Sequence, residues 1–460
     1  MKATGSGFTP GETVAFALDG VSLGVTTIAD GAGAFANVAV PIPANTTSAL
    51  HQVSATGQTS AATTSTPLKI AVFWAQFGFD SGHSGYNPHE TSVSPANVAT
   101  LVPGWTTNIP KGYAVNSQPA VGDGNVYITS QSCYMNAFAL DTGALIWSYN
   151  VCLISNNGAI GYATPTLAQG TVYVAGDGYL WAWNDQTGTL LWKAALSISG
   201  GFGMGSYVTY ADGMVFTLDD AGSAHALDAT TGAPLWNSSS HPGTCANSTA
   251  VAGGAAYLYI NGTVIALNES TGAPLWSTTL PNQTCSVAAT VANGQVYVVN
   301  INTVQQLDTL YALNASTGAT TWSVTVPSFG AGAPAPTVAN GIVYLKTYQS
   351  ASRAYNALTG ALLWSSPLGV ANWTIPVVAN GVLYVASGTE LITANATTGA
   401  DLWNTVVGGI IGPRITYATV ADGVVYVIIS QPNNASTIKT LHLPTAAHKL
   451  PNGPHRSRTL

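Results

Sequence analysis

Hydrophobic and polar residues alternate along most of this chain in short runs that turn-forming pairs separate. Typical runs are Asn125-Val-Tyr-Ile-Thr and Gln295-Val-Tyr-Val-Val, which are rich in β-branched and aromatic residues. Such alternation predicts β-strands. Asn-Gly and Asp-Gly pairs lie between the runs and favour tight hairpins, because both residues tolerate positive φ. The pattern predicts an all-β protein.

One pattern, an apolar residue followed by x-x-Gly-x-Val-Tyr-Val, recurs along the chain with some variation. Its eight copies are Val121–Ile128, Leu167–Val174, Tyr210–Thr217, Val251–Leu258, Val291–Val298, Val338–Leu345, Val378–Val385 and Val420–Val427. A short segment ending in Asn or Asp follows each of the first seven copies, and then a Thr-Gly turn. The sequence therefore predicts one structural unit copied along the chain.

A tryptophan follows each Thr-Gly turn by four residues. The turns end at Gly143, Gly188, Gly232, Gly272, Gly318, Gly360 and Gly399, and the tryptophans are Trp147, Trp192, Trp236, Trp276, Trp322, Trp364 and Trp403. The tryptophans are 39 to 46 residues apart. Four strands in about 42 residues are typical of a propeller blade.

The eighth copy ends at Leu443 with three predicted strands and no tryptophan behind it, whereas an isolated Trp105 precedes the first copy. We expect the strand around Trp105 to complete the last blade, since closure removes exposed sheet edges. The fold class predicted is all-β, with an eight-bladed β-propeller over residues 101–443 whose N-terminal strand closes the last blade.

The segment Ala226-Leu-Asp-Ala-Thr-Thr-Gly-Ala-Pro-Leu-Trp236 resembles the quinoprotein-type repeat. This repeat builds pyrroloquinoline quinone (PQQ) dehydrogenases and non-enzymatic relatives such as outer-membrane assembly factors of the BamB type. The resemblance implies that Trp105 and the seven repeat tryptophans dock between neighbouring blades. Residues 76–88 resemble the lead-in of secreted bacterial PQQ-like proteins, within a linker and lead-in predicted over 67–100.

The two ends of the chain differ from the repeats. Residues 1–66 contain no tryptophan and alternate in short strands, as in Val14-Ala-Phe-Ala-Leu. They resemble a bacterial immunoglobulin-like β-sandwich with a clipped first strand. Met1 is then expected to be an internal or artificial start. Residues 444–460 combine prolines with basic residues, and we expect them to be disordered.

Only 6% of the residues are charged, against about 25% in typical soluble domains. A net charge of −7 with 11 scattered Lys and Arg residues argues against nucleic acid or anionic membrane as a partner. No apolar run approaches the roughly 20 residues that span a bilayer. The resemblance to secreted repeat proteins and to cell-surface modules implies that the chain is extracellular or at the cell surface.

Four cysteines fit an oxidising compartment. Cys133 and Cys152 fall at the same end of the first predicted blade, so a disulfide is expected there. Cys245 and Cys285 occupy equivalent loops of adjacent blades, and either a second disulfide or two buried thiols would fit. No Cys-x-x-Cys occurs, so no zinc site is expected. Ten Asn-x-Ser/Thr sequons permit glycosylation, although Asn and Thr are also ordinary turn residues here.

The loops that enter the innermost strands surround the channel mouth, the default ligand site of a propeller. Their candidate ligand-binding residues are aromatic, amide and hydroxyl in character with one cation: Tyr113, Asn116, Gln118, Tyr162, Tyr207, Asn247, Trp373, Arg414 and Tyr417. Such groups suit a neutral sugar-like or peptide-like ligand. Alternatively, the tyrosines form a sealed channel floor and bind nothing.

A PQQ enzyme needs several cations for the three carboxylates of the cofactor, a calcium site and a catalytic base. No such cluster and no Cys-Cys pair is evident in the sequence, so no catalytic residue, cofactor or metal is predicted. The expected function is a non-catalytic binding or scaffold propeller that recognises a protein or glycan. The alternatives are a PQQ- and calcium-dependent dehydrogenase, and a self-assembling structural subunit of a surface array or filament.

Overall fold

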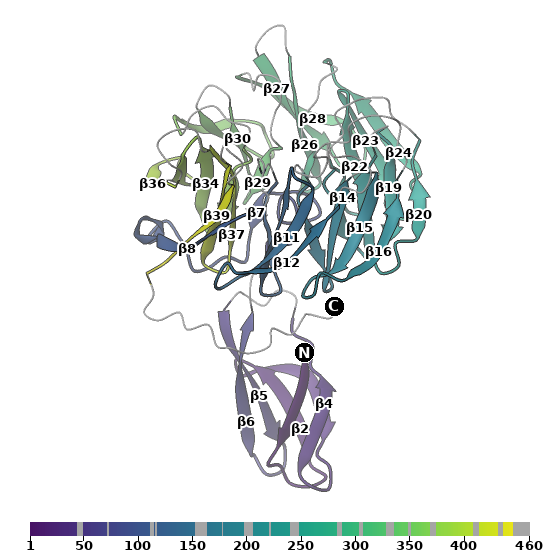
Figure 1. The fold of residues 1–460 in the computed structure, drawn as a ribbon, viewed down its shortest axis with the longest axis vertical. Helices are drawn as coiled ribbons and strands as arrows, with labels where there is room; N and C mark the ends of the chain where they lie inside the picture. Colours follow the sequence, from purple (N-terminus) through teal and green to yellow (C-terminus); the bar gives the residue numbers. More distant parts are fainter. Residues whose placement is uncertain are drawn as a thin grey trace. The chain divides into compact units, whose positions relative to one another are not determined.

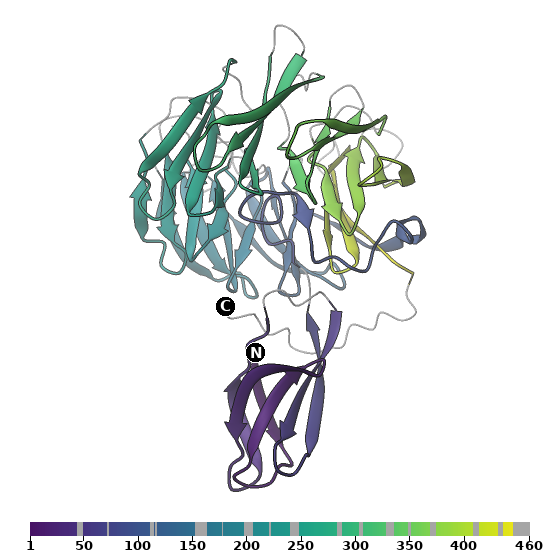
Figure 2. The same ribbon diagram turned by 180° about the vertical axis from the view of Figure 1, so that it is seen from behind.

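The computed structural model describes residues 1–43, 49–70, 73–110, 115, 117–151, 163–176, 178–196, 206–219, 222–239, 248–282, 288–302, 307–327, 335–347, 351–368, 374–407, 414–430 and 436–444. Within these residues, all regular structure is β except the short 3-10 helix η1 (Val98–Thr100). The prediction of an all-β chain is confirmed. The chain divides into two compact units, with the boundary between Val72 and Phe73 (Figures 1 and 2).

The smaller unit contains two sheets that share one core. In one, β1 (Lys2–Ser6) pairs with β4 (Ala34–Ala39); the other has the order β3 (Val21–Ile28), β2 (Thr13–Leu18), β5 (Ala49–Gly57) and β6 (Thr63–Ile70). Phe16 of β2 meets Phe35 of β4 edge-to-face, with ring centroids 5.3 Å apart. Phe8, Val14 and Ala55 are buried in the same cluster.

The described strands of the larger unit form eight sheets, numbered here in chain order, in which all pairings are antiparallel except one short parallel pairing in sheet 7. Sheet 1 contains β9 (Ala120–Gly122), β10 (Asn125–Ser130), β11 (Tyr134–Ala139) and β12 (Leu145–Asn150). Sheet 2 contains β13 (Thr166–Ala168), β14 (Thr171–Gly176), β15 (Tyr179–Asn184) and β16 (Leu190–Ala195). Sheet 3 contains β17 (Thr209–Ala211), β18 (Met214–Leu218), β19 (Ala224–Asp228) and β20 (Pro234–Asn237). Sheet 4 contains β21 (Ala250–Ala252), β22 (Ala255–Ile260), β23 (Thr263–Asn268) and β24 (Pro274–Thr279).

The second half of the unit repeats this order. Sheet 5 contains β25 (Thr290–Ala292), β26 (Gln295–Asn300), β27 (Leu307–Asn314) and β28 (Thr320–Pro327). Sheet 6 contains β29 (Thr337–Ala339), β30 (Ile342–Lys346), β31 (Ser352–Asn356) and β32 (Leu362–Ser366). Sheet 7 contains β33 (Val377–Ala379), β34 (Val382–Ser387), β35 (Glu390–Asn395) and β36 (Asp401–Val406), and the short β7 (Tyr86–Asn87) joins it. Sheet 8 contains β37 (Arg414–Ala421), β38 (Val424–Ser430), β39 (Thr437–His442) and β8 (Val102–Asn108).

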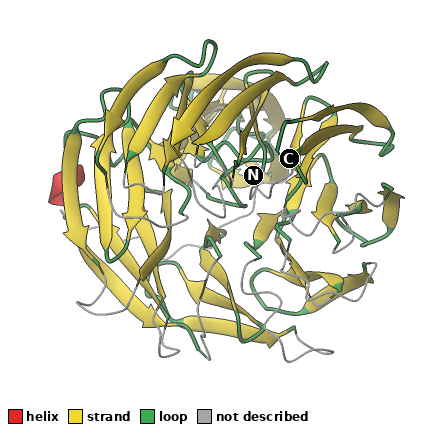
Figure 3. Cartoon of the chain, turned by 90° about the horizontal axis from the view of Figure 1, so that it is seen from above, coloured by secondary structure: helices red, strands yellow, loops and turns green. Residues whose placement is uncertain are grey.

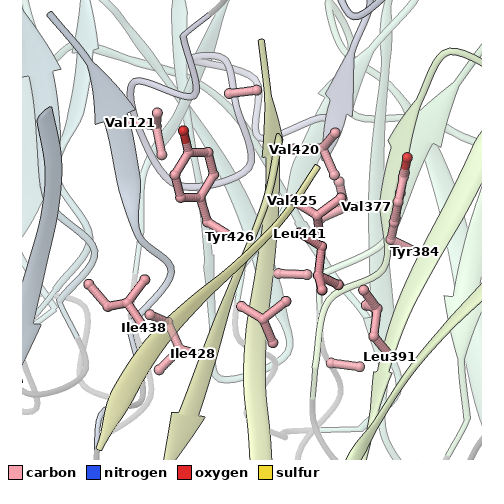
Figure 4. Packing of buried hydrophobic residues seen from close by; sticks show 14 of the residues in the cluster. Val121, Val377, Tyr384, Leu391, Val420, Val425, Tyr426, Ile428, Ile438 and Leu441 are labelled. Atoms are coloured by element: carbon pink, nitrogen blue, oxygen red, sulfur yellow. The ribbon is translucent and has the colours of Figure 1, made fainter. Parts of the chain in front are cut away.

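The sheets surround a common centre, and the first strand of each sheet contacts the first strands of its two neighbours (Figure 3). β37 of the last sheet contacts β9 of the first. β8, which carries Trp105, pairs antiparallel with β39 in the register Lys439 to Thr106. Apolar residues of sheets 1, 7 and 8 pack together at this junction (Figure 4). The larger unit is therefore a β-propeller type of repeat structure.

The first hairpin of most sheets is a two-residue turn with both residues at positive φ. In sheet 1, Asp123 and Gly124 have φ of 49° and 83°, as a type I′ turn requires. The six turns of this Asn-Gly or Asp-Gly kind begin at Asp123, Asp212, Asn293, Asn340, Asn380 and Asp422. The Asn-Gly and Asp-Gly pairs seen in the sequence therefore form the hairpins that connect the first two strands of these sheets.

At seven of the eight junctions, a sheet is held to the next by an indole lying on a glycine. The glycine of the following Thr-Gly turn adopts positive φ, and a Cβ built on it would lie within 2.4–2.6 Å of the ring. The indole N–H donates to a main-chain oxygen of that same turn: Trp105 to Leu140 (3.0 Å), Trp147 to Asp185 (2.8 Å), Trp192 to Ala229 (3.2 Å), Trp236 to Glu269 (2.7 Å), Trp276 to Ala315 (2.9 Å), Trp322 to Ala357 (3.0 Å) and Trp364 to Ala396 (3.1 Å). Trp403 packs instead against the apolar cluster of sheet 8.

Threonine hydroxyls form a second link between sheets, nearer the centre. Thr166, Thr209, Thr290, Thr337 and Thr419 occupy one equivalent position of the innermost strands and are fully buried. Their hydroxyls donate to main-chain oxygens of the next sheet, at Val208, Thr249, Pro336, Pro376 and Pro119 respectively. The ring is thus fastened by indoles at its outside and by hydroxyls at its inside.

Two glycines of sheet 5 provide a matched test of the indole contact. Gly318 and Gly294 both have φ of 72°, but only Gly318 has a neighbour, since Trp276 would lie 2.4 Å from its added Cβ. Gly294→Ala should cost about 1–2 kcal/mol for the left-handed backbone. Gly318→Ala should cost a further ~1–3 kcal/mol because the indole must move. Urea unfolding of both variants measures the difference, and equal losses would contradict the proposed role of the contact.

Candidate functional site

The segment Trp74–Asn87, called the plug below, runs around the centre of the ring and contacts the first strand of every sheet. Trp74 and Val121 exchange both main-chain hydrogen bonds at 2.8 and 2.9 Å. The remaining contacts, in chain order, are Leu167 N–H to the Ala75 oxygen, Tyr210 N–H to Gln76 Oε1, Val251 N–H to the Ser81 oxygen, Val291 N–H to the Gly82 oxygen, Val338 N–H to the Ser84 oxygen, Val378 N–H to the Gly85 oxygen, and Asn87 Nδ2 to the Val420 oxygen.

These eight positions are the first residues of the eight repeat copies found in the sequence. Each lies in the innermost strand of its sheet, and among the described residues no other strand runs beside the inward edge of these strands, apart from β7 on β33. The plug therefore satisfies at least one main-chain group in each sheet. Sequence reasoning placed this segment in a linker and lead-in and did not predict the contacts.

The glycines of the plug are the signal that sequence reasoning missed. A Cβ on Gly82 would lie 2.4 Å from the Val291 oxygen, and one on Gly85 would lie 2.6 Å from Thr337 Oγ1. A side chain at either position would push the plug away from the inner strands. Glycines at such close approaches are a recognisable requirement of backbone packing.

A ring of side chains, called the collar below, lies three residues before each plug contact. Its members are Gln118, Thr164, Tyr207, Ser248, Ala288, Ala335, Ile375 and Tyr417, and all except the half-buried Tyr417 are buried. Phe77 of the plug packs into one cluster with Tyr207, Ala288, Ala335 and Ile375. The collar and the plug together fill the centre of the ring at this level.

Aromatic contacts cross the centre. Phe77 stacks on Tyr207 with ring centroids 4.0 Å apart and an interplanar angle of 6°. The hydroxyl of Tyr207, just before sheet 3, is hydrogen-bonded to Tyr417 of sheet 8. Burial, and secondly Tyr417, raise the pKa of Tyr207 well above its ordinary value. Tyr207 is therefore neutral and held by protein partners on both its ring and its hydroxyl.

Gln118 is also occupied by protein groups. Its Oε1 accepts from the Gly78 N–H at 3.1 Å, and its Nε2 donates to the Ala418 oxygen at 3.2 Å. Its own N–H donates to Thr164 Oγ1. Since Gln118 is 1% exposed, this amide ties the plug to sheets 1 and 8.

His83 is a buried, neutral part of the plug. Its Nε2 lies 2.8 Å from Thr209 Oγ1 and its Nδ1 lies 3.2 Å from Ser248 Oγ. Because the Thr209 hydroxyl donates to the Thr249 oxygen, the Nε2–H donates to Thr209. Burial lowers the pKa of His83 to about 3.

The nine candidate ligand-binding residues fall into three groups. Gln118, Tyr207 and Tyr417 lie together in the collar. Arg414 begins β37, and its side chain lies outside the described residues. The remaining five also lie outside them, namely Tyr113, Asn116, Tyr162, Asn247 and Trp373.

Charged groups near the collar end of the sheets are buried and hydrogen-bonded. Lys346 Nζ donates to the Ala386 oxygen at 2.6 Å, and burial lowers the pKa of Lys346 to about 7. Asp219 accepts from His225 Nε2 at 2.9 Å. Within the described ranges, no group of three or more His, Cys, Asp or Glu residues could hold a metal ion.

Cys133, at the start of the β11 hairpin, is disulfide-bonded. Cys152, Cys245 and Cys285 lie outside the described residues, so the pairing of Cys133 with Cys152 stays a prediction. The sequence-predicted disordered tail lies outside them too, except for Pro444. No helix in the part of the chain that the structure describes is long and apolar enough to cross a membrane.

The repeats match a known family. The family described as outer membrane protein assembly factor BamB, built of PQQ-like repeats, matches residues 89–219, 134–258, 220–309 and 300–428. Taken together, these matches run from residue 89 to residue 428 and cover more than half of the chain. The chain belongs to this family.

Curated relatives of three kinds are similar in sequence. Tetrathionate hydrolase of Acidithiobacillus ferrooxidans is 28% identical over 379 residues, covering 72% of this chain and 73% of that protein. Quinohemoprotein alcohol dehydrogenase of Comamonas testosteroni is 28% identical over 186 residues, covering 37% of this chain and only 26% of the dehydrogenase. Outer membrane protein assembly factor BamB of Moranella endobia is 27% identical over 295 residues, covering 63% and 66%.

Solved structures share the fold at low identity. BamB from Moraxella catarrhalis has a TM-score of 0.55 and 17% identity, covering 74% of this chain and 99% of that chain. Quinohemoprotein alcohol dehydrogenase ADHIIG from Pseudomonas putida HK5 has a TM-score of 0.63 and 14% identity, covering 84% and 82%. Enzymatic and non-enzymatic proteins thus share this fold, so the fold alone does not assign a function.

The burial of His83 predicts a pH dependence of stability. The imidazole is neutral in the folded protein, with a pKa of about 3, but takes up a proton near pH 6.5 when unfolded. Stability is therefore fully present above about pH 6.5 and is lost as the pH falls, by up to about 1.4 kcal/mol per pH unit. Urea unfolding measures the free energy of unfolding at each pH between 6 and 4. For His83→Gln, the slope of this free energy against pH should be smaller by the contribution of one proton. An unchanged slope would place His83 in water.

Two truncations test the plug. A chain starting at Phe73 keeps the plug and β8, and we expect it to fold. A chain starting at Val93 keeps β8 but lacks the plug, so it leaves inward main-chain groups of all eight sheets unpaired, at about 1–3 kcal/mol for each buried group. It should unfold or aggregate in gel filtration and thermal melting. Equal melting temperatures for the two chains would mean that the plug is dispensable.

Proposed function

We propose that this protein is a non-catalytic binding or scaffold protein, built as an eight-bladed propeller in which each of the eight sheets is one blade. It recognises a protein or glycan through the mouth loops beyond the collar. The observation that carries the proposal is the filled centre, because Gln118 and Tyr207 already have protein partners. A ligand at this end would rest on the collar and contact the entering loops rather than penetrate the ring.

The relatives support a protein partner. BamB is named as an outer membrane assembly factor, and the family matched by this chain carries the same description. We infer an extracellular or cell-surface location, and the disulfide at Cys133 fits an oxidising compartment. We also infer that the smaller unit is an immunoglobulin-like module. The third candidate, a structural subunit that self-assembles into a surface array or filament, rests on the low charge of the chain.

The PQQ- and calcium-dependent dehydrogenase is the second candidate, favoured by the similarity to quinoprotein alcohol dehydrogenases. The described residues do not fit that cofactor. The collar is uncharged, whereas three carboxylates need converging cations. Lys346 is buried and donates to the Ala386 oxygen. We therefore propose no cofactor and derive no step through PQQ.

Position-specific photo-crosslinking in the source cells tests the binding role. A photoreactive residue at Tyr113, Tyr162 or Trp373 should give discrete crosslinked products, because the sequence predicts that these loops surround the mouth. The same residue at Asn293 or Asn340, in the turns at the opposite end of the sheets, is the matched control. Crosslinks confined to the control positions, or none at the mouth, would overturn the proposal.

Enzymatic alternatives are tested on the same purified protein. Gel filtration with PQQ and calcium should give no co-eluting quinone absorbance and no dye-linked oxidation of alcohols or sugars. Incubation with tetrathionate, the substrate named for a relative that covers 72% of this chain, should give no hydrolysis products. Stoichiometric co-elution of PQQ, or turnover in either assay, would contradict the non-catalytic proposal and assign the corresponding enzymatic activity to the protein.

A further inference from the structure

Two pairs of carboxyl side chains face each other across equivalent sheet junctions, at the turn end of the sheets. Asp123, in the first hairpin of sheet 1, lies within hydrogen-bonding reach of Asp185, in the Thr-Gly turn of sheet 2. Asp212 of sheet 3 meets Glu269 of sheet 4 in the same way. The two junctions are therefore built alike, two sheets apart.

At two of the seven sheet junctions with a following Thr-Gly turn, both of these positions are acidic. At the position of Asp185 and Glu269, the other Thr-Gly turns carry Leu140, Ala229, Ala315, Ala357 and Ala396. The hairpin residues of the sheets that precede the four alanines are uncharged, namely Gln169, Gly253, Asn293 and Asn340, whereas Asp422 is the hairpin residue of the sheet that precedes Leu140. A chain with 18 acidic residues in 460 thus places four of them in two facing pairs.

Facing carboxylates need a positive partner. Asp185 and Glu269 are 3% and 5% exposed, and two like charges 4 Å apart repel by about 4 kcal/mol near a protein surface. The groups that raise the pKa of Asp123 and Glu269 are burial first and then the facing carboxylate, and no basic residue is among them. Either a shared proton or a bound cation must offset the repulsion.

The second pair has a free ligand atom. Glu269 Oε1 is buried and has no hydrogen-bond partner within the described residues, although its side chain reaches Asp212. An unpaired buried carboxylate oxygen is costly, and hard divalent cations prefer such oxygens. Asp212 is exposed, so water can complete the coordination.

We propose that each of the two pairs, Asp123 with Asp185 and Asp212 with Glu269, binds one hard divalent cation of the calcium class. The bound cation fastens sheet 1 to sheet 2 and sheet 3 to sheet 4. The sites lie at the opposite end of the sheets from the collar, so they are independent of the binding function proposed above and of any cofactor.

The blade tryptophans provide a direct readout with terbium, which substitutes for calcium at oxygen sites. The Trp147 indole donates to the Asp185 main-chain oxygen at 2.8 Å, and the Trp236 indole donates to that of Glu269 at 2.7 Å. Excitation of tryptophan should therefore sensitise bound terbium, and calcium should quench the emission by competition. Glu269→Gln should remove roughly half of the emission, since one of two oxygen sites is lost.

Controls separate a site from general acidity. Asp228→Asn removes an acid from the Thr-Gly turn of sheet 3, where Ala229 occupies the position of Asp185 and Glu269. This variant should therefore keep the full terbium emission. If Glu269→Gln fails to fold, the exposed Asp212→Asn should give the same loss. In thermal melting at pH 7.5, calcium should raise the melting temperature of the wild type but not that of the Asp123→Asn/Glu269→Gln double variant.

Two outcomes would overturn the proposal. One is terbium emission in the wild type no greater than in the double variant. The other is a melting temperature that rises on acidification but not with calcium at pH 7.5, which would mean that each pair holds a shared proton only.

Discussion

The contact between an indole and a side-chain-free turn is the constraint on which the ring depends. A glycine in the Thr-Gly turn does two things at once: it adopts positive φ, and it leaves room for the tryptophan of the preceding sheet. The indole N–H then pairs with a main-chain oxygen of the same turn. One residue type therefore sets the shape of a turn and the position of the neighbouring sheet, which explains why turn and tryptophan keep a fixed offset along the chain.

The sequence predicted what is local to one repeat. The hairpin pairs, the strand alternation and the tryptophan offset are each fixed within about ten residues, and the structure has them all. The partnership of β8 with β39 was also predictable, because an unpaired Trp105 strand and a three-stranded last repeat complement each other. Such signals are strong because they recur.

The candidate site was predicted less well, for a physical reason. The plug uses mainly main-chain atoms, and each of its contacts is to a different repeat, so no periodic signal marks it. Gln118 shows the consequence: an amide in an entering loop is typical of a ligand site, yet here it joins the plug to two sheets. Tyr207 likewise stacks on Phe77 within the protein. Side-chain type alone does not distinguish a ligand contact from an internal one.

Closure of sheet 8 joins the two ends of the larger unit, and this has a consequence during synthesis. The Thr440 hydroxyl donates to the main-chain oxygen of Trp105 across 335 positions of the chain. While a ribosome is still making the intervening repeats, β8 has no partner and exposes a strand edge, the kind of surface on which chains aggregate. The plug, by contrast, leaves the ribosome before every inner strand it contacts, so each new sheet meets an existing partner. The sheets can thus assemble in the order of translation, and the pairing of β8 with β39 forms last.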